Sequence, residues 1–229
     1  MSSPVAVGVD VSARHGLDVV ALDRRRRLAC RPLPRQELSD LRDLLEELRP
    51  GVVAIDSPPR FAAAGQSRQC ERELARRGIH CYFTPARDGA RSPFYDWMRK
   101  GQDVFQAAED AGYPLYVAGR SVRGGAIEVF PHASAVVLRA RLPPGGSAKS
   151  RYRKTRWRKE LLRRWSVDTA VLLSLDLVDA ALAALTGLRA LYGSFCTVGD
   201  PRDGTIVLPA RSLADSYARS RGRAALDRH

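Results

Sequence analysis

Cysteine is scarce in this 229-residue sequence, and its four copies are scattered at Cys30, Cys70, Cys81 and Cys196. No two of them form a Cys-x-x-Cys pair, which argues against a structural zinc site. The N-terminus also has no signal-peptide pattern, and scattered free thiols in such a chain are typical of a reducing compartment. We therefore expect a cytoplasmic protein whose cysteines stay reduced.

Long apolar runs are also missing. The most hydrophobic stretch, residues 169–192, is interrupted by Asp176, Asp179 and Arg189. Because charged side chains are costly at the centre of a bilayer, we interpret this stretch as a buried helix and expect no membrane span.

Negative charge is outweighed by positive charge. The chain has 38 lysine and arginine residues against 25 aspartate and glutamate residues, a net charge of +13. A field of this sign concentrates polyanions, so we expect nucleic acid, DNA or RNA, as the partner, with an anionic membrane surface as the weaker candidate. Only four of the 38 basic residues are lysine, and a composition biased toward arginine is the alternative explanation.

The first quarter of the chain predicts three strands, a helix and a fourth strand. Short apolar runs predict strands over residues 5–11, 18–22, 28–32 and 52–55. Leucines recur at three- and four-residue intervals over residues 36–48 and predict a helix, which Pro50 and Gly51 end. This order of elements is typical of the RNase H-like fold and of the actin-like ATPase domains.

The rest of the chain mixes helical and strand patterns. We expect helices over residues 69–77, 95–111, 151–165 and 169–191, and strands over residues 126–130 and 206–208. The whole predicts one α/β domain over residues 1–211, a mixed sheet flanked by helices, with an insertion at about residues 60–125 that lies over the active face. Residues 212–229 are a polar, arginine-rich tail whose composition is typical of disorder.

Five carboxylates stand on elements that a metal site in this fold would use. Asp10 and Asp56 each end an apolar strand, where an ionised carboxylate is costly unless it is paired or bound to metal. At the ends of adjacent parallel strands the two would raise each other's pKa, a conflict that a divalent cation removes. Asp176 and Asp179 share one face of the last helix, and Glu128 lies inside the fifth strand.

Each of these residues also has an ordinary structural interpretation. An aspartate at the end of a strand often forms a turn or caps a helix, and Asp176 could cap the last helix together with Ser174. Glu128 could simply face water. We prefer the functional interpretation because all the carboxylates lie on elements that contribute to an RNase H-like site.

Several short motifs together resemble the family numbered 429 among the domains of unknown function, which is described as predicted nucleases with an RNase H fold. The motifs are Gly8-Val9-Asp10, Val53-Ala54-Ile55-Asp56-Ser57-Pro58, Arg68-Gln69-Cys70-Glu71, Glu128-Val129-Phe130-Pro131, residues 176–184 and residues 199–209. The resemblance runs from about residue 5 to residue 210. It implies an RNase H-like nuclease whose acidic pattern includes Glu128.

The last helix also looks like that of RuvC-type Holliday-junction resolvases. In that group, acids on the first strand, the fourth strand and this helix hold the metals, which implies Asp10, Asp56, Asp176 and Asp179 as metal ligands here. The predicted-nuclease family often shows two adjacent acids before the last helix, whereas here Leu175 precedes Asp176, and it often has an acid after Pro131, where this chain has His132. Resolvases of this type are dimers, which leaves a homodimer open.

The resemblance implies a two-metal hydrolysis of phosphodiester bonds. Two Mg²⁺ or Mn²⁺ ions would lie about 4 Å apart and be bridged by Asp10. Asp56 and Asp179 would each complete one coordination shell, with Asp176 or Glu128 assisting. Oxygen ligands without organised histidine or cysteine suit these hard cations and not zinc.

A basic helix is expected to hold the substrate. Over residues 151–164, eight of the 14 residues are basic and one is acidic, with aromatic residues between them. Basic side chains follow phosphates and aromatic faces stack on bases, although a solvated helix whose tryptophans pack on the sheet is the alternative. The expected substrate-binding residues are Arg68, Arg87, Arg151, Arg153, Lys154, Arg156, Trp157 and Arg158. His132 is a candidate for proton transfer, although a loop histidine is more often a bystander.

Two other functions fit parts of this pattern. A non-catalytic nucleic-acid-binding domain would keep the fold and the charge, and it would bind without cleaving. An actin-like phosphotransferase shares the first elements, but it needs glycine-rich phosphate loops, for which only Gly124-Gly125 and Gly145-Gly146 are available. We therefore predict a divalent-metal-dependent nuclease and leave the choice between DNA and RNA open.

Overall fold

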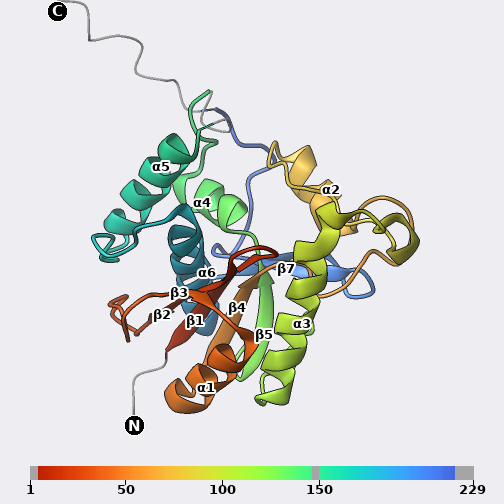
Figure 1. The fold of residues 1–229 in the computed structure, drawn as a ribbon. Helices are drawn as coiled ribbons and strands as arrows, with labels where there is room; N and C mark the ends of the chain where they lie inside the picture. The colour runs from red at the N-terminus through yellow and green to blue at the C-terminus, as the bar shows by residue number, and fades with distance from the viewer. Residues whose placement is uncertain (1–4, 146–149, 220–229) are drawn as a thin grey trace, which may run out of the picture.

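A mixed sheet of seven strands forms the centre of this computed structural model, which describes residues 5–145 and 150–219 (Figure 1). The strands are β1 (Ala6–Ser12), β2 (Gly16–Leu22), β3 (Leu33–Gln36), β4 (Val52–Asp56), β5 (Gly125–Val129), β6 (Cys196–Asp200) and β7 (Gly204–Leu208). Their order is β3-β2-β1-β4-β5-β7-β6. β1, β4, β5 and β7 run parallel, whereas β2 and β6 run antiparallel to their neighbours. The expected α/β class, a mixed sheet flanked by helices, is confirmed.

Helices cover both faces of the sheet. They are α1 (Leu38–Leu48), α2 (Gln69–Arg76), α3 (Asp96–Asp110), α4 (Pro131–Arg139), α5 (Arg151–Arg164) and α6 (Leu175–Leu191), with short 3-10 helices η1 (Arg87–Gly89) and η2 (Pro93–Tyr95). Figure 1 shows α4, α5 and α6 on one face of the sheet and α1 and α3 on the other, and each group encloses its own hydrophobic core. α2 packs against β6 and β7 at the far edge.

The close contact between α6 and the sheet depends on Gly8 in β1. A Cβ atom at this position would lie 2.1 Å from the carbonyl oxygen of Ala180 and 2.3 Å from the amide nitrogen of Ala184. Only glycine leaves room for the helix backbone here. The contact fixes α6 over β1, so that the first turns of the helix lie beside Asp10, near the carboxyl end of the strand.

The third strand begins later in the chain than the sequence pattern predicts. The expectation was residues 28–32, but β3 spans Leu33–Gln36. Asp23 closes a tight turn after β2 by accepting hydrogen bonds from two backbone amides of the turn, at 2.8 and 2.9 Å. The residues that follow make only an isolated bridge to β2, and regular pairing starts at Leu33.

The sequence pattern predicts neither α4 nor β6. Pro131 follows β5 and is also the first residue of α4, a position where the missing N–H of proline costs no hydrogen bond. β6 has no continuous apolar run and is held by backbone pairing with β7. α6 begins at Leu175, later than residue 169, because the hydroxyl of Ser174 caps it by accepting a hydrogen bond from the amide of Leu177 at 2.9 Å.

The polar tail runs back along the protein as far as residue 219. Tyr217 is 7% exposed, and its amide donates to the carbonyl oxygen of Arg77 at 3.1 Å. This part of the tail is therefore packed beyond the end of α2, while residues 220–229 lie outside the described residues. Within the described ranges, no helix combines the length and the apolar character that are needed to cross a bilayer.

Candidate functional site

Three aspartates form a row across neighbouring strands near the carboxyl end of β1. Asp10 lies opposite Asp56 of the parallel strand β4 and, on its other side, opposite Asp18 of β2. Residues directly opposite each other project their side chains to the same face of a sheet. That face is covered by α6, because Gly8, two residues before Asp10, contacts the α6 backbone. The two strand-end aspartates are therefore neighbours, as the sequence pattern predicts.

α6 adds two further carboxylates to this row. Asp176 and Asp179 lie in its first turns, and the negative charge of each helps to raise the pKa of Asp10. Each is held by an arginine of α5: Arg151 donates to both carboxylate oxygens of Asp176, at 2.9 and 3.1 Å, and Arg158 pairs with Asp179. We call the set of five the acidic edge; its members are Asp10, Asp18, Asp56, Asp176 and Asp179.

Burial and mutual repulsion raise the pKa values along the acidic edge. Burial is the largest cause at Asp10, whose pKa lies well above its usual value, and the charge of Asp56 is the next. Burial likewise raises the pKa of Asp56 to about 8, with repulsion from Asp179. The pKa of Asp18 rises to about 6 through burial and the charge of Asp176. With a pKa of about 8, Asp56 is therefore mostly protonated at neutral pH, although its side-chain hydrogen bond with Asp10 opposes part of the rise.

The acidic edge suits a divalent cation in the kind of donor that it offers. Carboxylate oxygens are the ligands that Mg²⁺ and Mn²⁺ prefer, and a cation would remove the repulsion that raises the pKa values. In the described residues, however, no three Asp, Glu, His or Cys side chains converge into a ready metal-binding group. Asp176 and Asp179 are engaged by arginines instead. To serve as metal ligands, those two aspartates would have to exchange arginine for the cation.

Glu128 projects from the opposite face of the sheet. It lies opposite Ile55, the residue before Asp56, and side chains alternate along a strand. Glu128 accepts hydrogen bonds from Arg68 at 2.8 and 2.5 Å, and the same guanidinium donates to Glu71 at 2.9 Å. The exposure of Glu128, Arg68 and Glu71 is 4%, 2% and 1%. The candidate catalytic Glu128 and the candidate substrate-binding Arg68 line the same cavity as Asp10 and Asp56, but in this structure they are each other's ion-pair partners.

The candidate substrate-binding residues of α5 divide into an open and a buried group. The open group, exposed or half-buried, comprises Arg151, Arg153, Lys154 and Arg156. Trp157 is 7% exposed and packs in the core, with the guanidinium carbon of Arg139 at 4.8 Å from the centre of one of its rings. Arg158 is 6% exposed and engaged by Asp179. Trp157 and Arg158 therefore attach α5 to the protein and do not face a surface ligand.

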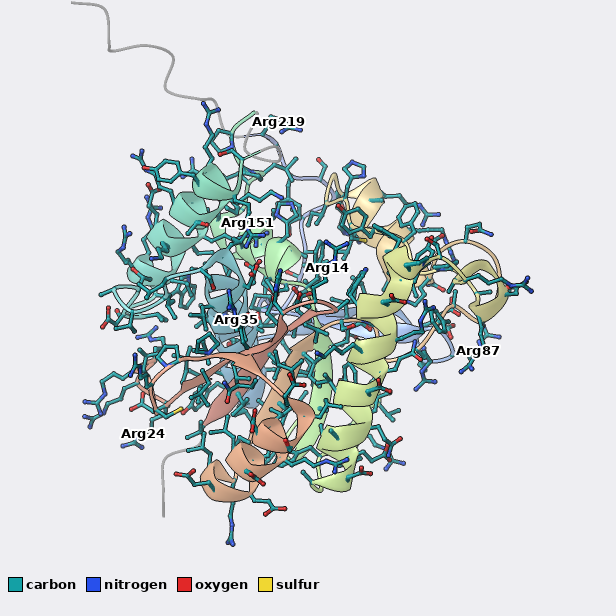
Figure 2. All side chains as sticks on the ribbon, viewed as in Figure 1. Arg14, Arg24, Arg35, Arg87, Arg151 and Arg219 are labelled. Carbon is teal, nitrogen blue, oxygen red and sulfur yellow. The ribbon has the colours of Figure 1, made fainter. Side chains whose placement is uncertain are left out.

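In Figure 2, Arg14 and Arg151 lie toward the middle of the view, whereas Arg87 lies at the periphery. Arg14, from the turn between β1 and β2, and Arg151 line the same cavity as Asp10. Arg87 lies at the outer end of the segment between β4 and β5, with its guanidinium carbon 5.9 Å from the ring centre of Phe61. Arg87 is thus remote from the acidic edge, whereas Arg14 is a neighbour that the sequence did not single out.

His132 is neutral at physiological pH. Burial, followed by the positive charges of Arg158 and Lys154, lowers its pKa to about 3. Its ring packs against Phe130, with ring centres 5.8 Å apart. A histidine with so low a pKa is a poor proton carrier near neutral pH, so the candidate role in proton transfer gains no support.

The acidic edge opens into a cavity of about 630 Å³. Asp10 and Asp56 line it and remain partly exposed. The segment between β4 and β5 contributes three aromatic residues to the lining, Tyr82, Phe94 and Trp97, which we call the aromatic wall. Part of the segment at residues 60–125 therefore lines the cavity beside the acidic edge.

Sequence reasoning missed Asp18 and the aromatic wall. Asp18 could have been found by pairing the first two strands across the turn at residues 13–15, which sets it opposite Asp10. Tyr82 belongs to a segment without helical or strand periodicity, and Phe94 to a single 3-10 turn. No local pattern indicates that these two residues meet.

Comparison with known proteins adds one relationship. No curated protein and no solved structure gives a significant match to the chain. A family model described as "Protein of unknown function (DUF429)" matches residues 8–203, a range that contains the whole acidic edge and every residue that lines the cavity beside it except Ile206. The chain therefore belongs to the DUF429 family.

Proposed function

We propose that this protein is a divalent-metal-dependent nuclease that hydrolyses phosphodiester bonds of DNA or RNA on an RNase H-like fold. The fold is supported by the strand order β3-β2-β1-β4-β5, in which an antiparallel meander leads through α1 to parallel strands. The position of α6 over β1 supports it further, because the carboxylates of the last helix lie beside that of the first strand.

The observation that carries the proposal is the pairing of Asp10 with Asp56 on adjacent parallel strands beside a cavity. Burial holds the pKa of Asp56 at about 8, and the pKa of Asp10 is also well above its usual value. A turn or a helix cap needs one carboxylate and gains nothing from a second beside it. A cation site needs several, and the cation relieves their repulsion.

The residues of the acidic edge would divide the work of binding. Asp10 and Asp56 would hold the metal, joined by the two aspartates of α6 once these leave their arginines. Bound Mg²⁺ or Mn²⁺ supplies an activated water and stabilises the leaving oxygen in phosphodiester hydrolysis. Arg151 is exposed, so on leaving Asp176 it can turn to a substrate phosphate, to which arginine donates two parallel hydrogen bonds.

The open face of α5 would bind the phosphate backbone. Arg153 and Arg156 are exposed on the same helix as Arg151, and the net charge of +13 adds long-range attraction. Contacts of this kind set affinity and position without reading base sequence. We also infer that the protein acts in the cytoplasm, where its free cysteines remain reduced.

The test is cleavage of labelled single-stranded, duplex and junction forms of DNA and RNA, with Mg²⁺ or Mn²⁺ and with EDTA. Wild type is compared with Asp10→Asn and with Asp110→Asn, a surface carboxylate on α3 that pairs with Arg42. We expect metal-dependent cleavage that Asp10→Asn abolishes and Asp110→Asn retains. Absence of cleavage of every substrate by wild type, at protein concentrations that saturate binding, would contradict the proposal.

A non-catalytic nucleic-acid-binding protein is the second candidate, and the two arginine pairs at Asp176 and Asp179 favour it. This function predicts salt-sensitive binding that metal and Asp10→Asn leave unchanged. The phosphotransferase alternative gains no support. The described residues form one sheet, Gly124-Gly125 leads into β5, and Gly146 lies outside the described residues.

A further inference from the structure

Two rings of the aromatic wall, those of Tyr82 and Phe94, are exposed where they line the cavity. Tyr82 is 70% exposed and Phe94 is 49% exposed, and the two rings meet edge to face with centres 5.2 Å apart. Trp97, at the start of α3, lines the same cavity. Exposed aromatic faces beside a polar site leave apolar area in water that a flat ligand could cover.

The part of the wall that holds Phe94 is fixed before any ligand arrives. Arg99 of α3 donates to the carbonyl oxygen of Ala90 at 2.6 Å and to the carboxylate of Asp96 at 2.5 Å. The hydroxyl of Ser92 accepts a hydrogen bond from the amide of Phe94 at 3.2 Å. The turn that carries Phe94 is therefore already held by hydrogen bonds, and little ordering of this turn would be needed when a ligand binds.

The part that holds Tyr82 is tied to the sheet through the buried network. Thr84, two residues after Tyr82, donates to Glu71 from its amide at 2.9 Å and from its hydroxyl at 2.5 Å. Glu71 is joined to Arg68, and Arg68 to Glu128 of β5. The network thus holds the wall at a set position relative to the strands that carry Asp10 and Asp56. This gives Glu128 a positioning role.

Positive charge lies on the same cavity as the wall. Arg14 lines it and, within the described part of the chain, has no side-chain hydrogen bond or ion pair. Arg151 lines it too, and its pair with Asp176 is exposed and therefore weak. A ligand in the cavity can thus meet both exposed aromatic rings and the guanidinium groups of Arg14 and Arg151.

We propose that the aromatic wall is a stacking subsite for an unpaired nucleobase, so that the substrate is single-stranded at the point of reaction. This proposal rests on the proposed function, because it takes the acidic edge as the place where the phosphodiester bond is cleaved. A cavity of about 630 Å³ has the size of a nucleotide-binding pocket. A base within a duplex already stacks on its neighbours and cannot offer its face, whereas an unpaired base can lie on Tyr82 or Phe94 while its phosphates meet Arg14 and Arg151.

The test measures binding in EDTA, where no cleavage occurs, by fluorescence anisotropy. The ligands are one sequence as single-stranded DNA, as single-stranded RNA and as a duplex, and a strand of the same length with abasic sugars in place of nucleotides. The proteins are wild type, Tyr82→Ala, Phe94→Ala and Phe83→Ala. Phe83 is the matched control because it is 43% exposed and adjacent to Tyr82 but does not line the cavity.

We expect Tyr82→Ala and Phe94→Ala to weaken single-strand binding by roughly 5- to 100-fold. The dependence of affinity on salt should stay unchanged, because phosphate contacts remain. Binding of the duplex and the abasic strand should be weaker in wild type and indifferent to the two variants. Comparing single-stranded DNA with single-stranded RNA shows which of the two nucleic acids supplies the stacked base.

Equal affinity of wild type for the base-bearing and abasic strands would overturn the subsite, as would an equal loss in Phe83→Ala. Failure of the subsite and failure of the nuclease are distinguishable. If binding follows the expected pattern but no cleavage occurs, the stacking subsite is supported and the nuclease activity is contradicted. Cleavage of duplex at the single-strand rate, with no effect of Tyr82→Ala, keeps the nuclease and removes the subsite.

Discussion

Arg158 of α5 and Asp179 of α6 form an ion pair at the acidic edge, and the two residues are 6% and 8% exposed. The charge of Arg158 opposes the upward shift in the pKa of Asp179 and in that of neighbouring Asp56. Arg158 is thus a resident counter-ion among carboxylates that otherwise repel one another. A divalent cation at Asp10 and Asp56 would compete with it for Asp179.

Replacing this counter-ion should make the protein depend on metal for stability. Arg158→Met leaves Asp179 buried without a partner, which lowers the free energy of unfolding by about 3–5 kcal/mol near pH 8. Excess Mg²⁺ should restore more stability to the variant than it adds to wild type, because the cation replaces the lost charge. Urea unfolding with Mg²⁺ and with EDTA measures both effects.

Arg156→Met is the control for this variant. Arg156 is exposed and pairs with Glu160 along α5, so its loss should change stability by at most about 1 kcal/mol. Equal stabilisation by Mg²⁺ in wild type and in Arg158→Met would argue that no cation approaches Asp179.

The raised pKa of Asp56 predicts how stability changes with pH in EDTA. The folded protein holds a proton on this group up to about pH 8, whereas the unfolded chain releases it near the usual aspartate value of about 4. The stabilisation is therefore complete below about pH 4 and is lost as pH rises toward 8, by at most about 1.4 kcal/mol per pH unit for one proton.

Asp56→Asn should flatten this loss of stability between about pH 5 and 8, while Asp110→Asn should not. Because metal binding requires the ionised carboxylate, Mg²⁺ should also stabilise wild type more near pH 8 than near pH 6. Thermal unfolding across this range gives the slopes. A wild-type slope that Asp56→Asn leaves unchanged would show that Asp56 titrates normally.

Glu128 should matter for stability and for the cavity but not for the metal. Glu128→Gln removes the charge that Arg68 faces in a buried network, so we expect a loss of about 3–5 kcal/mol in the free energy of unfolding. Calorimetric titration should find the Mg²⁺ affinity of the folded variant equal to that of wild type. Thr84→Val, which removes one hydrogen bond to Glu71, provides a milder variant of the same network. A tenfold loss of Mg²⁺ affinity in Glu128→Gln at unchanged stability would restore Glu128 as a ligand.

The open face of α5 should set the salt dependence of nucleic-acid binding. Arg153→Ala and Arg156→Ala should each weaken binding uniformly across sequences and reduce the slope of log affinity against log salt by about 1. Arg24→Ala is the control, because Figure 2 shows Arg24 at the outer end of the β2–β3 connection, away from α5. An effect of Arg24→Ala as large as those of the α5 variants would mean that overall charge, and not α5, governs binding.

The central strands and the pairing of Asp10 with Asp56 could be predicted from sequence because they depend on local pattern. An apolar run that ends in aspartate predicts a buried strand and indicates where that strand ends. The two aspartates of α6 followed from their spacing on an apolar helix. The close approach of that helix to β1 also has a local cause, because no side chain fits at Gly8.

The remaining features depend on register and on distant partners. Glu128 and Asp56 face opposite sides of the sheet because β4 and β5 align Ile55 with Glu128, and no single-strand pattern sets that alignment. The sequence could not indicate that Arg158 is buried in an ion pair, because most positions of this helix are basic and nothing distinguishes one from another. The meeting of Tyr82 with Phe94 depends on how two irregular segments fold together, and sequence periodicity carries no information about it.

A crystal structure of the protein grown with Mn²⁺ tests the central claim most directly, through anomalous difference density from the ion. We expect a peak bound by both Asp10 and Asp56, with Asp179 turned from Arg158 toward the ion. A structure at saturating Mn²⁺ with no peak at this edge, and with the Arg158–Asp179 pair and the Asp10–Asp56 hydrogen bond intact, would contradict it.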